Sequence, residues 1–154
     1  MTPHQKFMRE ALREARGAME RGEVPVGAVV VRDREIVGRG SNRTEEAGEP
    51  TQHAEIVAIR DACLNLGEKR LDNCRLYVTL EPCPMCAGAI VLARFRALFF
   101  GAFDAKAGAA GTLYTVTTDP RLNHVVETHG GILDAECADL LRRFFQAKRS
   151  TADL

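Results

Sequence analysis

The sequence lacks several features that would place it among membrane, secreted or repetitive proteins. Its 154 residues contain no apolar run of membrane-spanning length, and the charged amphipathic pattern at the N-terminus does not resemble a signal peptide. No internal repeat, linker or low-complexity segment interrupts the chain. We therefore expect one domain with a substantial core, spanning residues 1–154, in a protein that is not embedded in a membrane.

The sequence also lacks net charge, because its 21 basic residues balance 21 acidic ones. A nucleic-acid partner would therefore have to be met by a local basic patch and not by the field of the whole chain. The five cysteines are an odd number without secretory features, which predicts reduced thiols and a cytoplasmic location. We expect Cys63, Cys74 and Cys137, which have apolar neighbours, to be small buried side chains.

The chemistry-bearing residues lie in two stretches, His53-Ala54-Glu55 and Glu81-Pro82-Cys83-Pro84-Met85-Cys86. One histidine and a Cys-x-x-Cys pair supply three ligands of the kind that zinc prefers, and leave a fourth position open, as catalytic sites do. With two thiolates the zinc charge is already balanced, and a ligating carboxylate would close the site. We therefore predict His53, Cys83 and Cys86 as ligands of one Zn²⁺ per chain, and Glu55 as a proton shuttle.

Two other interpretations use only part of this pattern. A four-ligand structural zinc site would need a fourth ligand near His53, and the nearest cysteine, Cys63, stands alone on a helical stretch. A redox Cys-x-x-Cys would leave His53 and Glu55 without a role. His-x-Glu followed by Pro-Cys-x-x-Cys is the signature of zinc nucleobase deaminases, which favours catalysis over both.

Periodicity and turn signals divide the chain into alternating helices and strands. The expected elements, in order, are a helix from Pro3 that ends at Gly22, a hairpin of strands Val24–Val31 and Glu35–Gly40, a loop Ser41–Pro50, a helix capped by Thr51 that ends at Gly67, a strand Cys74–Leu80, a helix Pro84–Ala93, strands Ala97–Gly101 and Val125–Thr128, and a final helix capped by Asp134. This order predicts an α/β fold of three layers, α/β/α, around a mixed sheet of about five strands.

Two of these helices begin at the zinc residues, so their N-termini should converge on the metal at one edge of the sheet. The partial positive charge at helix N-termini favours thiolate over thiol and keeps the ligands ionised. On the helix that follows Cys83 we expect the apolar side chains to be core. These are Met85, Ile90, Val91 and Leu92.

Over nearly its whole length the sequence resembles the cytidine-deaminase superfamily, and within it the bacterial tRNA-specific adenosine deaminases. The zinc residues are common to the superfamily, whereas Asp-Ala-Lys-x-Gly-Ala-Ala-Gly and the terminal helix with Phe144-Phe145 point to the tRNA enzymes. The matching stretches are Glu23–Val29, Ser41–Arg43, Thr51–Ile56, Leu76–Cys83, Met85–Ala89, Asp104–Lys106, Gly108–Gly111, Asn123-His124 and Phe144-Phe145.

The resemblance implies roles for residues that composition and spacing do not assign. Asn42 would hydrogen-bond a flipped base, and Asp104 would lie by the sugar and backbone of the target nucleotide. Four residues would shape the pocket: Glu23, Val26, Ala54 and Leu80. The basic final helix, with Phe145 or its neighbour Phe144 facing a base, would contact RNA. Judged by residue type alone, Asn42 and Asp104 are equally well explained as turn or loop stabilisers.

The resemblance further implies a homodimer that deaminates the wobble adenosine of a tRNA anticodon stem-loop, in an arginine tRNA, to inosine. The sequence departs from the residues common in the family at Ser41, Thr44 and Phe103. The resemblance therefore defines the contacts with RNA less fully than the zinc chemistry. One alternative is a guanine deaminase or another free nucleobase or nucleoside deaminase, since these share the zinc residues. A second is a non-catalytic zinc or RNA-binding subunit, which would have no need of Glu55.

Overall fold

The computed structural model describes residues 1–152 as five helices and five strands. Their bounds, in chain order, are α1 Pro3–Glu20, β1 Gly27–Arg32, β2 Glu35–Ser41, α2 Thr44–Ala47, α3 Ala54–Leu66, β3 Arg75–Leu80, α4 Pro84–Ala93, β4 Ala97–Ala102, β5 Glu127–His129 and α5 Asp134–Ala152. Within this described part, no helix combines the length and the hydropathy needed to cross a membrane.

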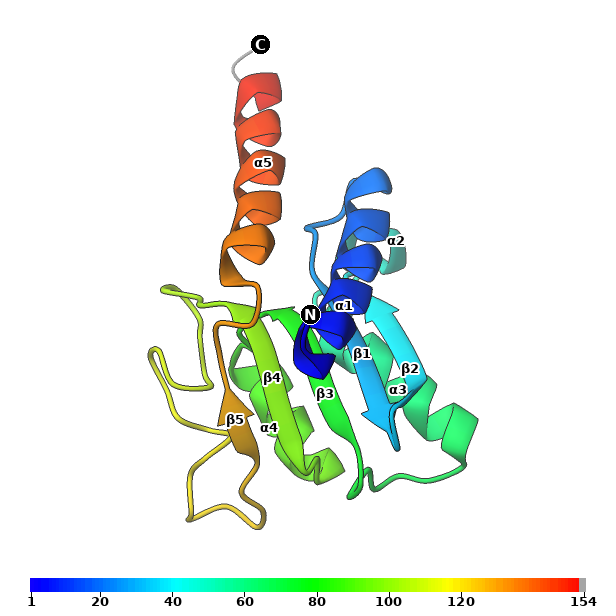
Figure 1. The fold of residues 1–154 in the computed structure, drawn as a ribbon. Coiled ribbons are helices and arrows are strands. Elements are labelled where there is room, and N and C mark those ends of the chain that lie inside the picture. The colour runs from blue at the N-terminus through cyan, green and yellow to red at the C-terminus, as the bar shows by residue number, and fades with distance from the viewer. Residues whose placement is uncertain (153–154) are drawn as a thin grey trace.

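The strands form one mixed sheet in the order β2-β1-β3-β4-β5. The central strand β3 pairs antiparallel with β1 and parallel with β4, and β4 pairs parallel with β5. Helices α3 and α4 cover one face of the sheet, and α1 and α5 lie on the other (Figure 1). The predicted three-layer architecture with five strands is therefore confirmed.

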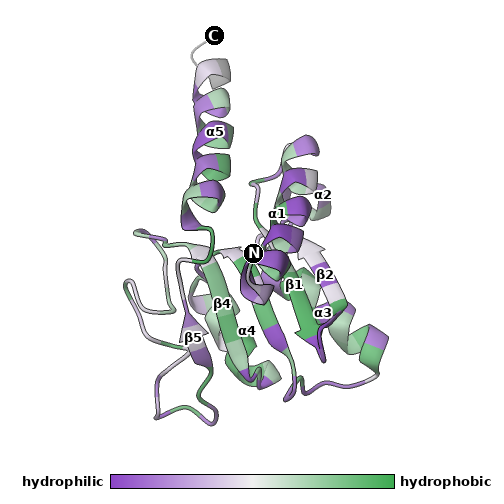
Figure 2. Cartoon of the chain, viewed as in Figure 1, coloured by the Kyte–Doolittle hydropathy of each residue, from purple (hydrophilic) through white to green (hydrophobic). Residues whose placement is uncertain are grey.

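Two apolar clusters, one on each face of the sheet, hold the layers together. The first joins strand residues such as Val30 and Val78 to Ala58 and Ile90 of α3 and α4. The second joins the other side of the same strands to α1 and α5. Green hydrophobic residues accordingly concentrate in the central strands and purple hydrophilic ones on α1 and α5 (Figure 2). Strand β4 is buried along its whole length, as expected for a strand covered on both faces.

Glycines in β2 set the position of α3, which carries the first half of the zinc pattern. A Cβ on Gly40 would lie 2.4 Å from the backbone nitrogen of Ala58 and 2.5 Å from the carbonyl oxygen of Ala54. A Cβ on Gly38 would meet the next turn of α3, 2.7 Å from the Ala58 carbonyl oxygen. The helix backbone therefore rests directly on the strand backbone, and any side chain at these positions would push α3 outward.

Two details of the segment before α3 differ from the prediction. Thr51 does not cap α3, because its hydroxyl bonds the Glu49 carboxylate at 2.7 and 2.8 Å; the N-cap is His53. The expected loop 41–50 also contains the single-turn helix α2. The buried carboxylate of Glu23 accepts hydrogen bonds from the backbone N–H groups of Glu45 and Glu46 at 3.0 and 2.7 Å, a long-range cap that local sequence does not reveal.

The prediction that Met85 and Leu92 are core is wrong. Both lie on the outer side of α4, and Leu92 is 79% exposed, whereas Ile90 and Val91 are buried as expected. Because α4 is apolar on all sides, its sequence cannot distinguish the face against the sheet from the face left open. Of the remaining cysteines, Cys74 and Cys137 are buried and Cys63 is partly exposed.

Candidate active site

The two helix starts deliver the predicted metal ligands. His53 is the N-cap of α3 and Cys83 is the N-cap of α4, and both have the extended backbone of an N-cap. Neither side chain makes the hydrogen bond by which an N-cap residue normally satisfies its helix. Proline at position 84 fixes the first turn of α4 and brings Cys86 back beside Cys83. Both N-cap side chains are thus directed to one point between the two helices.

The spacing of the three donor atoms fits a tetrahedral zinc ion. The Nδ1 atom of His53 lies 3.6 Å from Sγ of Cys83 and 3.4 Å from Sγ of Cys86. All three donor atoms lie within 4.8 Å of one another. Ligands of tetrahedral zinc, at about 2.3 Å for sulfur and about 2.0 Å for nitrogen, are separated by roughly 3.5–3.8 Å. The His-Cys-Cys cluster therefore fits one Zn²⁺ with one coordination position to spare.

Hydrogen bonds link the protonation of the two thiols and of His53. A hydrogen bond from Cys86 lowers the pKa of Cys83 to about 4, against the opposing effect of burial, and His53 adds to the lowering. The pKa of Cys86 is raised because its proton bonds the Cys83 sulfur and because it is buried. A bond to Cys83 likewise raises the pKa of His53. Shared protons of this kind are what a divalent cation displaces on binding.

Glu55 lies one residue inside α3, buried beside the ligand cluster. Burial raises the pKa of its carboxyl to about 7, although a bond from its own backbone N–H and the positive charge of His53 oppose the shift. A carboxyl with a pKa near neutrality can both accept and return a proton at physiological pH. Glu55 is not one of the three residues whose donor atoms cluster, in agreement with its predicted separation from the ligands.

A cavity of about 300 Å³ opens onto this cluster. Its lining includes the predicted residues Val26, Asn42, Ala54, Leu80 and Asp104, together with His53, Glu55 and Cys83. Sequence reasoning missed the four other lining residues, Val24, Thr44, Glu81 and Ala107. Residues from five separate segments thus converge on one space, and most of its wall is apolar, as in pockets that hold a planar base.

Two of the predicted substrate-binding residues do not line this cavity, nor does the predicted metal ligand Cys86. Glu23 is fully buried, and its carboxylate accepts hydrogen bonds from the backbone of α2. It thereby holds α2, and with it Thr44, at the cavity rim. Phe145 is 45% exposed on α5 and is not among the lining residues, whereas Phe144 is buried and packs edge-on against it. Phe145 therefore does not line the cavity, and contact between an RNA base and Phe145 or Phe144 stays a prediction; α5 extends away from the sheet (Figure 1).

Asn42 presents its amide to the cavity in a fixed orientation. Its Oδ1 accepts a hydrogen bond from the Thr44 backbone N–H at 3.3 Å, and its side chain is buried. No group within the described chain accepts a bond from its Nδ2. The turn-stabilising and ligand-binding interpretations of Asn42 are thus compatible, since one end of the amide serves each.

Asp104 and Glu81 build the opposite rim. One oxygen of Asp104 accepts bonds from the backbone N–H groups of Lys106 and Ala107, so this carboxylate shapes its own loop. The buried carboxylate of Glu81 holds the same loop through the backbone N–H groups of Asp104, Ala110 and Thr112 at 3.0–3.1 Å, and through the Thr112 hydroxyl. The position of Glu81 before Pro-Cys marked it as part of the pattern, but its partners lie 23 to 31 residues away.

Comparison with known proteins shows a family match and two relatives that are similar over nearly the whole chain. The model of the cytidine and deoxycytidylate deaminase zinc-binding region matches residues 1–102. The chain is 48% identical over 149 residues to the tRNA-specific adenosine deaminase of Bacillus subtilis strain 168, covering 97% of this chain and 92% of that protein. It is also 48% identical over 149 residues to the tRNA-specific adenosine deaminase of Agrobacterium fabrum, with coverages of 97% and 98%.

Among the solved structures, one of a tRNA deaminase is more similar to this chain than one of a guanine deaminase. A structure from studies of A-to-I editing by tRNA:A34 deaminases at the wobble position of transfer RNA is similar with a TM-score of 0.85 and 48% identity, covering 88% of this chain and 99% of that one. The guanine deaminase of Bacillus subtilis is more distant, with a TM-score of 0.64 and 34% identity over 97% of this chain and 95% of that one.

Proposed function

Because the chain belongs to the tRNA-specific adenosine deaminases of the zinc-dependent cytidine-deaminase superfamily, we propose that it converts the wobble adenosine of a tRNA anticodon loop to inosine. The observation that carries the proposal is the convergence of Glu55, Asn42 and the His-Cys-Cys cluster on one base-sized cavity. An arginine tRNA is the proposed substrate. We also propose that residues 1–154 form a single catalytic unit that works in the cytoplasm.

The reaction replaces the exocyclic amine at C6 of adenine by the oxygen of water and releases ammonia. His53, Cys83 and Cys86 would hold the zinc ion, which when bound supplies a Lewis acid that lowers the pKa of a water molecule. The carboxylate of Glu55 accepts a proton from that water. It delivers this proton to the ring nitrogen N1 as the C6–O bond forms, and then carries the second proton from the new C6–OH group to the amine, so that the C6–N bond breaks and ammonia leaves.

The surrounding residues would hold the base against Glu55. The free Nδ2 of Asn42 can donate to an acceptor on the purine ring, while Val26, Ala54 and Leu80 contact its faces and edges. A base reaches such a cavity only after leaving its stack. An anticodon loop makes that step inexpensive because its bases are already unpaired. We expect the half-buried Asp104, which lines the cavity, to contact the ribose of the flipped nucleotide.

We propose that α5 binds RNA through its charged side chains and not through an aromatic ring in the cavity. Arg142 and Arg143 pair with Asp139, and the ammonium of Lys148 lies 5.4 Å from the centre of the Phe144 ring. Exposed pairs of this kind are weak and can be exchanged for phosphate at little cost. We propose that α5 contacts the backbone of the stem and that Phe145 stays outside the cavity.

We propose a homodimer that covers the outer face of α4. Met85, Ala89 and Leu92 lie at helical spacing along this face, and a Cβ on Gly88 between them would meet no atom within 4 Å. A helix that is apolar on all sides is normally covered on all sides. A second copy pressed against this face would also lie close to both zinc sites, since α4 begins at Cys83.

The proposed activity is tested by incubating total tRNA with purified, zinc-loaded protein and sequencing the products for inosine. We expect inosine at the wobble position of the arginine tRNA and nowhere else in the pool. A Glu55→Ala variant that retains zinc should produce none, which ties the modification to this cavity. Inosine at the same level with the variant, or no inosine with the wild type, would contradict the proposal.

A further inference from the structure

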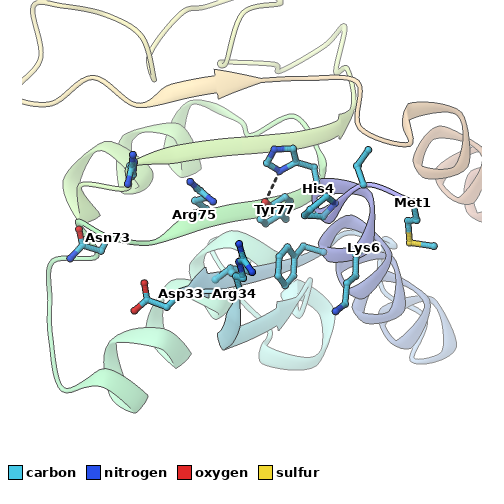
Figure 3. A pocket seen from close by; sticks show the side chains of 13 residues that line it. Met1, His4, Lys6, Asp33, Arg34, Asn73, Arg75 and Tyr77 are labelled. Carbon is cyan, nitrogen blue, oxygen red and sulfur yellow. Dashed lines mark hydrogen bonds between the residues drawn. The ribbon is translucent and has the colours of Figure 1, made fainter.

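A second and larger cavity, of about 800 Å³, lies at the other end of β3 from the deaminase cavity. It is bounded by the N-terminus of α1, the turn between β1 and β2, and the starts of β3 and β4 (Figure 3). None of its lining residues lines the deaminase cavity. We call it the arginine groove and define it by Lys6, Phe7, Asp33, Arg34, Arg75, Tyr77 and Arg96, with His4 and Asn73.

Positive charge accumulates around the arginine groove. Lys6, Arg34, Arg75 and Arg96 face a single acidic residue, Asp33. Within the described residues, none of these four cations lies within 4.0 Å of a carboxylate oxygen, while other arginines of the chain are paired; Arg39, for example, bonds both Glu10 and Glu14. Unpaired cations around a concave surface raise the local potential and attract anions.

The floor of the groove offers polar and aromatic contacts between these charges. His4 Nδ1 and the Tyr77 hydroxyl share a hydrogen bond of 2.8 Å, and the His4 ring stacks on Phe99 at 4.2 Å. Burial lowers the pKa of His4, and the positive charge of Arg75 lowers it further. Phe7, next to Lys6 in α1, adds an apolar ring to the lining of the groove.

We propose that the arginine groove binds a compact polyphosphate anion of the nucleoside di- or triphosphate class. Guanidinium groups recognise phosphate oxygens with two parallel hydrogen bonds, and Arg34, Arg75 and Arg96 supply three such groups. The volume of the groove lies within the range of small-molecule sites. The Phe7 ring gives the base an apolar surface while the phosphates meet the arginines.

The position of the groove favours a small ligand over the RNA of the proposed reaction. Arg75 and Leu80, at the two ends of β3, are separated by about 17 Å of extended strand. The groove also lies on the α1 face of the sheet, whereas the zinc cluster lies at the start of α3 and α4 on the other face. An anticodon loop seated in the deaminase cavity would have to wrap around the sheet to reach the groove.

The test is calorimetric titration of the full-length, zinc-loaded protein with inorganic tripolyphosphate, ATP and adenosine. We expect tripolyphosphate and ATP to bind, adenosine not to bind in the groove, and rising salt to weaken both phosphate ligands. The double variant Arg75→Gln/Arg96→Gln should weaken binding at least about tenfold, since it removes two charge-assisted contacts. The matched control is Arg16→Gln, an exposed arginine of α1 outside the groove, which should bind as the wild type does.

Retention of deaminase activity by the double variant would show that it is folded, because neither arginine lines the deaminase cavity. Arg34→Gln, on the exposed turn, serves as a second variant if the double variant does not fold, and it should weaken binding in the same direction. Absence of tripolyphosphate binding at millimolar concentration would overturn the proposal. Equal weakening by Arg16→Gln would overturn it too, as would a groove that binds a stem-loop RNA but neither small phosphate ligand.

Discussion

Replacing Glu81 by glutamine should destabilise the loop that closes the active-site cavity. One carboxylate oxygen of Glu81 bonds the Asp104 N–H and the Thr112 hydroxyl, and the other bonds the N–H groups of Ala110 and Thr112. A glutamine keeps one acceptor oxygen and replaces the other by an NH₂ group. The less harmful orientation leaves the oxygen with Ala110 and Thr112, because the Thr112 hydroxyl can rotate to accept a bond whereas the Asp104 N–H cannot.

The expected loss in the free energy of unfolding follows from the number of hydrogen bonds that change. The Asp104 N–H loses its acceptor, and an unsatisfied buried donor costs about 1–3 kcal/mol. The remaining bonds change from charged to neutral acceptors, which removes roughly another 1–2 kcal/mol. We expect Glu81→Gln to lower the free energy of unfolding by about 2–5 kcal/mol in total. Gly108 allows no compensating movement, since a Cβ there would lie 2.5 Å from the Glu81 carboxyl carbon and the loop is already packed against it.

The difference between wild type and variant should depend on pH with a definite sign. Burial raises the pKa of Glu81, but the bonds from Thr112, Asp104 and Ala110 outweigh it and hold the pKa below its usual range. A lowered folded-state pKa contributes stability that is complete above the unfolded pKa of about 4.3 and is lost as pH falls through the folded value. The two proteins should therefore differ fully at pH 7 and converge as the pH falls through the lowered folded-state pKa of Glu81.

Urea unfolding followed by far-ultraviolet circular dichroism measures this difference, with zinc content held equal. Glu20→Gln, an exposed glutamate without a hydrogen-bond partner among the described residues, is the matched control and should unfold within about 0.5 kcal/mol of the wild type. The variant should also lose deaminase kcat/KM, since Asp104 is released from its place at the rim. An unfolding free energy for Glu81→Gln as close to the wild type as that of the control would refute the reasoning.

Other substitutions test the remaining parts of the account. Cys86→Ala should lose bound zinc and activity together, as elemental analysis and an ammonia assay would record; full activity without zinc would remove the assignment. Glu55→Ala should keep its zinc but lose about 10²–10⁴-fold or more in kcat, and loss of the metal would instead make Glu55 a ligand. Gly40→Ala should cost about 1–3 kcal/mol in thermal unfolding by forcing α3 off β2, whereas Gly17→Ala, with its nearest contact at 3.6 Å, should not destabilise. Leu92→Glu should give a monomer in light scattering, and an unchanged dimer would place the interface elsewhere.

The fold was largely predictable because each local signal agreed with the tertiary structure. The Thr2-Pro3 start of α1 makes the expected cap, in which the Thr2 hydroxyl accepts the Gln5 N–H at 3.1 Å. Pro84 begins α4 where the sequence placed it. The parallel pairing of β3 with β4 follows from a strand, helix and strand in succession, as predicted.

Features that depend on distant partners were not predictable. The helix α2 exists because Glu23, more than twenty residues upstream, caps it. The α3 cap shifted from Thr51 to His53 because Glu49 takes the Thr51 hydroxyl. The outer face of α4 was assigned to the core because an apolar helix gives no sign of which side meets the sheet.

In the candidate site, too, roles set by local sequence could be predicted, whereas roles that depend on distant partners could not. His53, Cys83 and Cys86 could be predicted as ligands because their residue types and spacing are typical of a zinc site, and the structure brings these three residues together, whereas the role of Glu55 stays a prediction. The role of Glu81 stayed hidden because its hydrogen bonds reach across 23 to 31 residues to a loop whose conformation the sequence does not specify. Which of Phe144 and Phe145 would face a base could not be decided, because position on a helix gives the angle between two side chains but not the direction of the helix axis.

The most direct test of the central claim is a comparison of kcat/KM for an arginine-tRNA anticodon stem-loop, free adenosine and free guanine, each at two salt concentrations. An enzyme that draws binding energy from phosphates and neighbouring nucleotides should process the stem-loop far better than either small molecule. Rising salt should lower that advantage by weakening RNA binding through counterion release. Guanine as the best substrate, with the stem-loop inert, would contradict the tRNA assignment while leaving the zinc chemistry intact.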